Sequence, residues 1–224
     1  MKIFVYNGSP RGEKSLGYQF IKKIEDKMIH KGVGVEFNIY QSKDLDIKFS
    51  DGQVKDFLTG KTSFNDDMEK IENAMIESDF IILVSPVYAH NVSAQMKIFI
   101  DRLSYWLHIY RLIGKSGLAV SVSSDNGNES VNSYLEEMMG YLGIYVIGSV
   151  GIKRASIKDK KDIFDSYAEV WTKRIILSQN ENIEVPEIQE KNFRFQKEKY
   201  MKLEYATAEK EYWQKNGMFE RKGV

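Results

Sequence analysis

Short apolar runs rich in β-forming residues alternate with amphipathic helical patterns along most of the chain. The runs at 79–85 (DFIILVS) and 117–123 (GLAVSVS) are almost continuously apolar, which is typical of parallel strands covered by helices on both faces. The alternation of strands and helices predicts an α/β fold built on a doubly wound sheet. The predicted strands are 2–6, 34–40, 79–85, 117–123 and 144–150, and the predicted helices lie at about 15–31, 66–77, 92–110, 129–142 and 160–177.

Two segments interrupt the alternation. Residues 41–64 are polar and lack a clear period, so we interpret them as a loop between the second strand and its helix. From about 178 a polar stretch leads into a charged segment, 192–219, that contains seven aromatic residues. We predict a sheet domain at 1–178 and a carboxy-terminal arm at 179–224. Such an aromatic arm favours packing on a partner subunit, as a homodimer or a dimer of dimers.

The composition of the chain excludes several classes of protein. A chain of 224 residues is long enough for one α/β domain with an appendage. Lys plus Arg and Asp plus Glu are 32 each, so no net charge attracts nucleic acid or an anionic membrane. No run approaches the roughly 18 apolar residues of a membrane span, and the first apolar run is too short for a signal peptide. We expect a soluble, cytoplasmic protein that binds neither nucleic acid nor membrane.

The chain contains no cysteine, which excludes disulfides, thiolate zinc sites and iron–sulfur clusters held by cysteine. His30 and His108 lie in no carboxylate–histidine pattern, so we expect no metal site. The basic stretch 153–161 offers charges for a phosphate of NADPH, but we interpret it as a solvated loop.

The first turn, GSPRGEKS at 8–15, lies between a predicted strand and a predicted helix, where α/β proteins bind phosphate. A P-loop has Gly immediately before Lys-Ser or Lys-Thr, whereas here Glu13 precedes Lys14. A dinucleotide-binding turn has the spacing G-x-G-x-x-G, which glycines at 8, 12 and 17 do not match. Neither a nucleoside triphosphate nor a dinucleotide is therefore indicated.

The same turn suits a single monophosphate. The hydroxyls of Ser9 and Ser15, the guanidinium of Arg11 and the free N–H groups of the helix start can surround a dianion. An ordinary turn is an equally open interpretation, with Ser15 as the N-cap of the helix.

A second polar loop follows the third predicted strand, in SPVYAHNVSAQMKIFIDRL at 85–103. Pro86 ends the strand and Ser93 is suited to cap the next helix, so the loop projects Tyr88, His90 and Asn91. In a doubly wound sheet a crevice opens where the crossovers of neighbouring strands leave toward opposite faces. The first and second loops both reach this crevice, which favours a ligand site over isolated surface loops.

A third polar turn, SVSSDNGNES at 121–130, follows the fourth predicted strand. Ser123, Ser124, Asp125 and Gly127 offer small polar groups and backbone that tolerates positive φ. The turn suits the edge of a flat heterocycle, and it equally suits a surface turn that caps the following helix.

The segments GSPRGEKS and SDFIILVSPVYAHNVSAQMKIFIDRL together resemble the NAD(P)H-dependent FMN reductases of the flavodoxin-like superfamily, especially the branch of iron–sulfur flavoproteins. The resemblance covers about 1–150 and is moderate in the arm. It implies five parallel strands in the order 2-1-3-4-5, with FMN across the crevice between strands one and three. It implies phosphate contacts from Ser9, Arg11, Lys14, Ser15 and Leu16, ring contacts from Pro86, Val87, Tyr88 and Asn91, and contacts at the other ring edge from Ser124, Asp125 and Gly127.

Two features depart from that family. The phosphate loop is short and places Lys14 where a hydroxyl residue often stands, and the cluster cysteines are absent, so an iron–sulfur relay cannot operate. With no acid–base or nucleophile constellation in the sequence, we predict no catalytic side chain. The expected function is an FMN-dependent oxidoreductase that uses NADH or NADPH and reduces a quinone, free flavin or other small acceptor. A non-enzymatic flavodoxin-like electron carrier and a sensor without catalysis are the alternatives.

Overall fold

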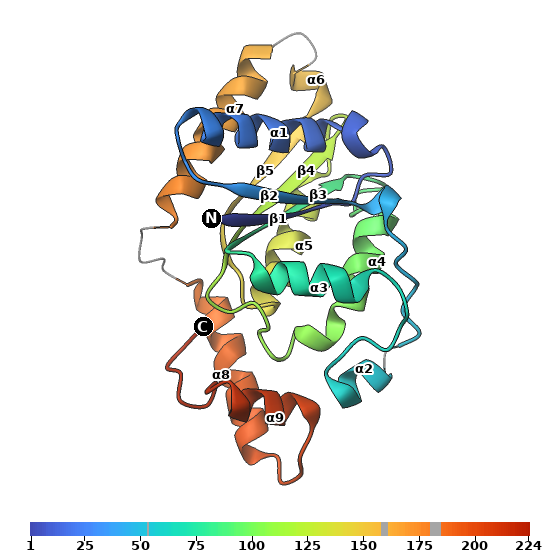
Figure 1. The fold of residues 1–224 in the computed structure, drawn as a ribbon, viewed down its shortest axis with the longest axis vertical. Helices are drawn as coiled ribbons and strands as arrows, with labels where there is room; N and C mark the ends of the chain where they lie inside the picture. Colours follow the sequence, from blue (N-terminus) through green and yellow to red (C-terminus); the bar gives the residue numbers. More distant parts are fainter. Residues whose placement is uncertain (53, 158–160, 180–184) are drawn as a thin grey trace.

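A five-stranded parallel sheet forms the middle layer of the computed structural model, which describes residues 1–52, 54–157, 161–179 and 185–224 (Figure 1). The strand order is β2-β1-β3-β4-β5, and every neighbouring pair runs parallel. This confirms the predicted fold class and strand order. The strands are β1 (Lys2–Asn7), β2 (Glu36–Gln41), β3 (Phe80–Pro86), β4 (Ser116–Ser123) and β5 (Tyr145–Lys153).

Helices cover both faces of the sheet. Alternating side chains of β1 point to opposite faces, so that Ile3 and Val5 belong to one apolar core and Phe4 and Tyr6 to the other. The first core is closed by α1 (Leu16–His30) and α7 (Lys161–Leu177), and the second by α3 (Met68–Glu77), α4 (Ala94–Arg102) and α5 (Asn128–Tyr141) (Figure 1).

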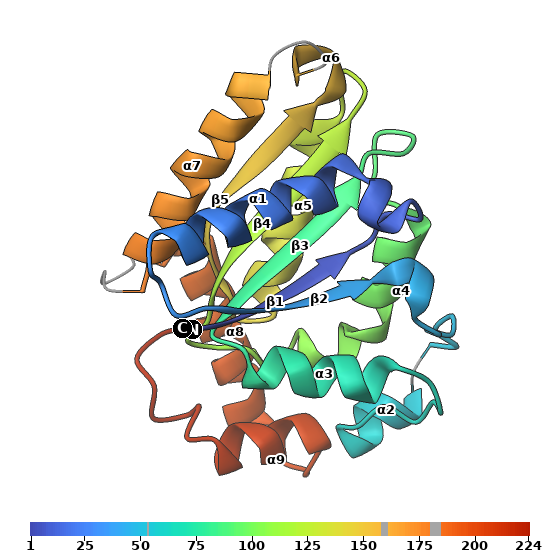
Figure 2. The same cartoon turned by 45° about the horizontal axis from the view of Figure 1, so that its top comes forward.

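Side-chain caps fix where two of these helices begin. Ser15 Oγ accepts a hydrogen bond from Tyr18 N at 3.2 Å, and Ser93 Oγ accepts one from Met96 N at 3.2 Å. Both predicted N-caps are therefore confirmed. They place the starts of α1 and α4 at the edge of the sheet where the strands have their carboxyl ends (Figure 2).

The predicted helix at 92–110 is wrong in its second half. The α-helix ends at Arg102, and a 3-10 turn, η3 (Ser104–Trp106), follows. Hydrogen bonds from Leu103 N to Ile100 O and from Trp106 N to Leu103 O span three residues. A spacing of three residues resembles the helical period closely enough that the apolar pattern continues without an α-helix.

The predicted loop at 41–64 contains a 3-10 turn, η2 (Ser42–Asp44), and a short helix, α2 (Val54–Thr59). The buried Arg102 fixes this segment, since it pairs with Asp66 and donates to Thr62 Oγ1 at 2.8 Å and Lys48 O at 3.1 Å. The segment is irregular in backbone but held to α4 by buried polar contacts.

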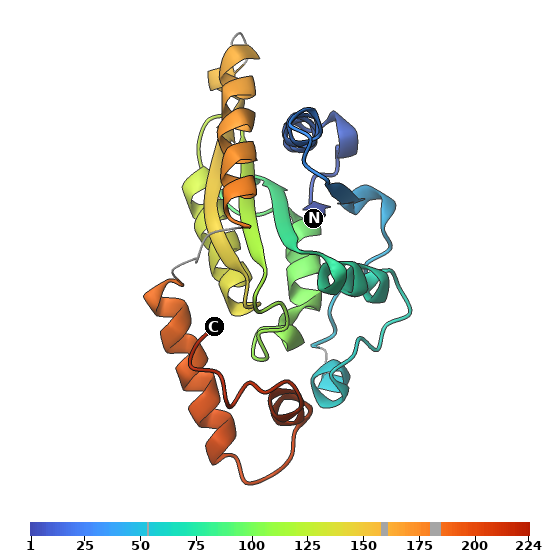
Figure 3. The same cartoon turned by 60° about the vertical axis from the view of Figure 1, so that its left-hand side comes forward.

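The arm forms α8 (Glu187–Lys202) and α9 (Ala208–Lys215), with α8 packed near α5 and α9 beside α2 (Figure 3). Its aromatic residues mostly pack on their own chain: Phe193, Tyr200 and Trp213 are at most 1% exposed and surround Tyr110 or one another. The arm's aromatic content therefore does not by itself require a partner subunit, and the oligomeric state stays a prediction.

The remaining short elements are η1 (Gly12–Lys14), directly before α1, and α6 (Arg154–Ile157), directly after β5. Both lie at the carboxyl edge of the sheet (Figure 2). No helix among the described residues is both long and apolar enough to cross a lipid bilayer.

Candidate functional site

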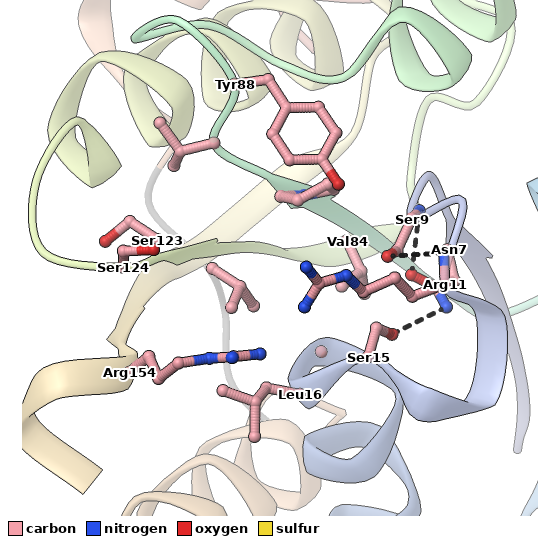
Figure 4. A pocket seen from close by; sticks show the side chains of 14 residues that line it. Asn7, Ser9, Arg11, Ser15, Leu16, Val84, Tyr88, Ser123, Ser124 and Arg154 are labelled. Carbon is pink, nitrogen blue, oxygen red and sulfur yellow. Dashed lines mark hydrogen bonds between the residues drawn. The ribbon is translucent and has the colours of Figure 1, made fainter. Parts of the chain in front are cut away.

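One pocket lies at the carboxyl edge of the sheet, between the loops that follow β1, β3 and β4 (Figure 4). The three polar loops predicted from the sequence therefore meet, and the start of α6 joins them. The pocket is lined by Asn7, Ser9, Arg11, Ser15, Leu16, Gly17, Val84, Pro86, Val87, Tyr88, Val122, Ser123, Ser124 and Arg154.

Ser15 shapes the first loop. Its hydroxyl donates to Gly12 O at 2.7 Å and accepts from Tyr18 N at 3.2 Å, so its hydrogen is already used within the loop. Ser9 differs, because its Oγ accepts from Arg11 N at 3.3 Å and no described acceptor takes its hydrogen. Of the two predicted phosphate-binding hydroxyls, Ser9 is the one free to donate into the pocket.

The start of α1 offers further donors. The first N–H groups of a helix have no partner within the helix. No hydrogen bond among the described residues uses the N–H of Leu16 or Gly17, and both residues line the pocket. A Cβ atom at position 17 would lie 2.4 Å from Val84 Cγ1, so glycine here allows α1 to approach β3.

Asn7 stabilises this loop by hydrogen bonds. The sequence analysis did not predict it as a site residue. It is 1% exposed, donates from Nδ2 to Gln41 Oε1 at 2.7 Å and accepts from Ser9 N at 3.3 Å. The signal in the sequence was a single amide at the carboxyl end of an otherwise apolar strand.

The second loop is a tight hairpin. Tyr88 N donates to Asn91 O at 2.9 Å, Asn91 N donates to Tyr88 O at 3.0 Å, and Ala89 and His90 between them have φ of 48° and 60°. Two positive φ values at the central positions are typical of a type I′ turn, which normally favours Gly or Asn there. The strained hairpin is held in place at the rim of the pocket, with the Tyr88 side chain 45% exposed.

The third loop packs closely on the second. Gly127, the N-cap residue of α5, has φ of 84°, and a Cβ atom there would lie 2.7 Å from Val87 Cγ1 and 3.3 Å from His90 Nδ1. Ser123 and Ser124 line the pocket, whereas Asp125 is exposed and lies outside the lining.

Most predicted site residues line the pocket, but four do not. Lys14 and Asp125 are exposed side chains of the loops, Gly127 sets the approach of two loops, and Asn91 Oδ1 accepts from Val92 N at 2.8 Å within the hairpin. The predicted residues that line it are Ser9, Arg11, Ser15, Leu16, Pro86, Val87, Tyr88 and Ser124.

Arg154 is the main residue that the sequence interpretation misplaced. We expected the stretch 153–161 to be a solvated loop, yet the Arg154 side chain lines the pocket (Figure 4). Its position directly after β5, at the edge where all strands end, was the available signal. Residues 158–160 of that stretch lie outside the described residues.

No group of three His, Asp or Glu side chains in the described ranges is arranged to hold a metal ion. Among the lining residues the charged side chains are Arg11 and Arg154, and there is no carboxylate. The pocket thus combines cationic and hydroxyl donors near α1 with an apolar wall formed by Val84, Val122 and the hairpin.

Comparisons with known proteins show a family by sequence. The chain matches the family described as NADPH-dependent FMN reductase over residues 1–156. It is 31% identical over 150 residues to an iron–sulfur flavoprotein of Methanocaldococcus jannaschii, covering 66% of this chain and 76% of that protein. It is 40% identical over 90 residues to an iron–sulfur flavoprotein of Archaeoglobus fulgidus, covering 40% of this chain and 41% of that protein.

Solved structures share the fold at low sequence identity. An NADH:FMN oxidoreductase in its apo form superposes with a TM-score of 0.60 at 20% identity, covering 79% of this chain and 89% of the other. An FMN-dependent NADH-azoreductase of Bacillus anthracis, in complex with FMN, gives a TM-score of 0.60 at 15% identity, covering 78% of this chain and 98% of the other.

Proposed function

Because the chain belongs to the NADPH-dependent FMN reductase family, we propose that it passes electrons from NAD(P)H, by way of FMN, to a quinone, free flavin or other small acceptor. The chain is an oxidoreductase, with FMN as its cofactor and NADH or NADPH as its co-substrate. The acceptor and the residues that bind each group belong to the proposal.

The residues of the pocket fit FMN in two parts. Near the start of α1 the Ser9 hydroxyl, the Arg11 guanidinium and the unpartnered N–H groups suit a phosphate. Away from that end Val84, Val122 and the Pro86–Tyr88 segment offer apolar surface for a flat ring. Cationic donors and an apolar wall meet in one pocket that has no carboxylate among its lining residues. This observation supports the proposal best.

When bound, FMN supplies the hydride and electron transfer, and the protein supplies position, electrostatics and access. Arg11 and Ser9 would hold the phosphate. Val84 and Val122 would exclude water from the ring, and the hairpin at Tyr88 would border the opening through which the nicotinamide and the acceptor enter. We assign no side chain a proton-transfer role.

Two measurements on the purified protein test the proposal. The absorption spectrum should show bound flavin, and anaerobic stopped-flow mixing with NADH or NADPH should bleach it. A protein that retains flavin but is bleached by neither nicotinamide would be an electron carrier, while a protein that cannot bind FMN would contradict the assignment altogether.

Arg11→Ala should weaken FMN binding about ten- to a hundredfold, as expected for loss of a charge-assisted hydrogen bond. Lys14→Ala is the matched control, because Lys14 lies in the same loop but does not line the pocket. Unchanged FMN affinity in Arg11→Ala would remove Arg11 from the site.

We also propose a cytoplasmic homo-oligomer, most simply a dimer. Ile188, Phe195, Met201 and Tyr205 of the arm are each at least 63% exposed, which leaves apolar surface for a second subunit. Light scattering at micromolar concentration tests this, and a monomer mass would contradict it.

A further inference from the structure

Arg154 enters the pocket from a fixed point of the backbone. Lys153 before it pairs with Ser123 as the last residue of β5, and Ala155 after it donates from N to Ser124 O at 3.1 Å. The backbone on both sides of Arg154 is thus anchored at the carboxyl edge of the sheet. The Arg154 side chain is exposed, and it lines the pocket.

The guanidinium of Arg154 faces that of Arg11 across the pocket. Figure 4 shows Arg154 lying beside Leu16, the first residue of α1, with Arg11 reaching toward it from the other side. In the part of the chain that the structure describes, no ion pair links Arg11 or Arg154 to a carboxylate. Two like charges that converge in one pocket repel each other unless an anion lies between them.

We propose that Arg154 is a second phosphate-binding residue, which closes on the FMN phosphate opposite Arg11 and makes the site selective for a dianionic monophosphate. This inference rests on the proposed function. A phosphate monoester carries close to two negative charges near neutral pH. The two guanidinium groups match that charge, and each can bind two phosphate oxygens at once.

The position of Arg154 favours the phosphate over the ring. In Figure 4 its side chain extends toward that of Leu16, the first residue of α1, and the N–H groups of Leu16 and Gly17 have no partner among the described residues. Tyr88 and its hairpin, which border the opening, lie on the opposite side of the pocket (Figure 4). Arg154 therefore belongs to the polar end of the site.

Binding of FMN and riboflavin tests the assignment, because riboflavin has the same ring and lacks the phosphate. Dissociation constants of both ligands are measured by fluorescence quenching for the parent protein, Arg154→Ala, Arg154→Lys and Lys153→Ala. Lys153→Ala removes the same charge from the neighbouring residue, which does not line the pocket. Thermal unfolding of each apoprotein checks that it is folded.

In Arg154→Ala we expect FMN binding to weaken about ten- to a hundredfold while riboflavin binding stays within about twofold. Arg154→Lys should lose less, and Lys153→Ala should leave both constants within about twofold. The FMN constant should also become less sensitive to salt in Arg154→Ala, since one cation fewer contacts the phosphate.

Three outcomes would overturn the inference. Equal losses for FMN and riboflavin would place Arg154 against the ring, and unchanged constants for both would remove it from the site. A rise confined to the KM for NADPH would assign it to the phosphate of the nicotinamide. Failure of the parent protein to bind either flavin would instead contradict the proposed function, so the two failures are distinguishable.

Discussion

Ser93 Oγ donates a hydrogen bond to Gly8 O at 2.6 Å, and the same oxygen caps α4 by accepting from Met96 N. Gly8 belongs to the loop after β1, and Ser93 follows the hairpin after β3. Ser93 N also donates to Ser85 Oγ at 3.0 Å. One buried serine thus joins the first two loops of the pocket. The same serine fixes the start of α4.

Ser93→Ala should therefore do more than remove a helix cap. Loss of the cap costs about 1 kcal/mol of the free energy of unfolding, and the unpartnered Gly8 carbonyl adds about 1 kcal/mol. Because the two loops are no longer tied, FMN affinity should also fall several-fold.

Thr207→Ala is the matched control for Ser93→Ala. Thr207 caps α9 by accepting from Lys210 N at 3.1 Å, far along the chain from the pocket loops. Urea unfolding should show a loss of about 1 kcal/mol, with FMN affinity unchanged. Equal FMN affinity in both variants would mean that the link to Gly8 does not position the loops.

The contact between the second and third loops can be tested at Gly127. Gly127→Ala places a Cβ atom 2.7 Å from Val87 Cγ1 and also strains a backbone with φ of 84°. Gly114→Ala carries the strain alone, because φ there is 87° and nothing lies within 4 Å of its Cβ. Strain should cost about 1–2 kcal/mol in each variant.

The difference between the two alanine variants measures the loop contact. We expect Gly127→Ala to lose more stability in urea unfolding than Gly114→Ala, and to bind FMN more weakly because the hairpin must shift. Equal stability and equal FMN affinity in the two variants would show that the hairpin can shift without affecting stability or FMN binding.

The sequence predicted the parts of this protein that depend on local pattern. The five strands, both serine caps and the convergence of the first two loops follow from apolar periodicity, N-cap chemistry and the topology of a doubly wound sheet, whereas the resemblance assigned the third loop to the site. The strand order 2-1-3-4-5 and FMN came from the resemblance. The resemblance assigned Lys14 and Asn91 to the site, yet the Lys14 side chain is exposed and Asn91 Oδ1 accepts from Val92 N within its own turn.

The other features of the pocket and of the arm depend on contacts between residues that are far apart in the sequence. Asn7 and Arg154 join the pocket only because β1 and β5 end at the same edge of the sheet, at opposite ends of the sheet domain in sequence. The burial of Trp213 against Tyr110 and Phe193 depends on how the arm folds back, which no periodicity encodes. Aromatic content alone could not distinguish a partner subunit from the chain's own core.

The free energy of unfolding should decrease as pH rises, because the carboxyl group of Glu72 is buried. This residue is 6% exposed and accepts from Tyr105 OH at 2.7 Å. Burial raises the pKa of Glu72 to about 7, although the Tyr105 hydrogen bond and Arg102 and Arg111 act in the opposite direction and Asp56 adds to the rise. The folded protein therefore holds this proton more tightly than the unfolded chain, whose carboxyl has its ordinary pKa.

The sign follows from proton linkage. Between the unfolded pKa and about 7 the folded state binds the extra proton, so the free energy of unfolding decreases as pH rises through this window. Glu72→Gln should remove roughly 2 kcal/mol of that decrease between pH 5 and pH 8. Urea unfolding at several pH values measures it, with Glu69→Gln, exposed in the same helix, as the control. A pH profile identical to that of the parent protein would contradict the buried, protonated carboxyl.

The last prediction concerns the route of the electrons. Both relatives compared above are named iron–sulfur flavoproteins, but this chain has no cysteine and three histidines. After anaerobic treatment with iron and sulfide we expect flavin absorbance without stoichiometric iron, because thiolate ligands are absent. The iron–sulfur flavoprotein of Methanocaldococcus jannaschii, treated in parallel, is the positive control. Stoichiometric iron with cluster absorbance in this chain would contradict the prediction.

Without a cluster, the acceptor must meet the cofactor directly at the opening that Tyr88 borders. We therefore expect two-electron, ping-pong turnover, in which the oxidised nicotinamide, NAD(P)+, leaves before the acceptor enters the same opening. Tyr88 is 45% exposed at that rim, so Tyr88→Ala should raise the KM for a quinone acceptor several-fold while the rate of anaerobic flavin bleaching by NAD(P)H changes less. Steady-state kinetics with both substrates varied should give parallel double-reciprocal lines, whereas intersecting lines would show that both substrates occupy the site together.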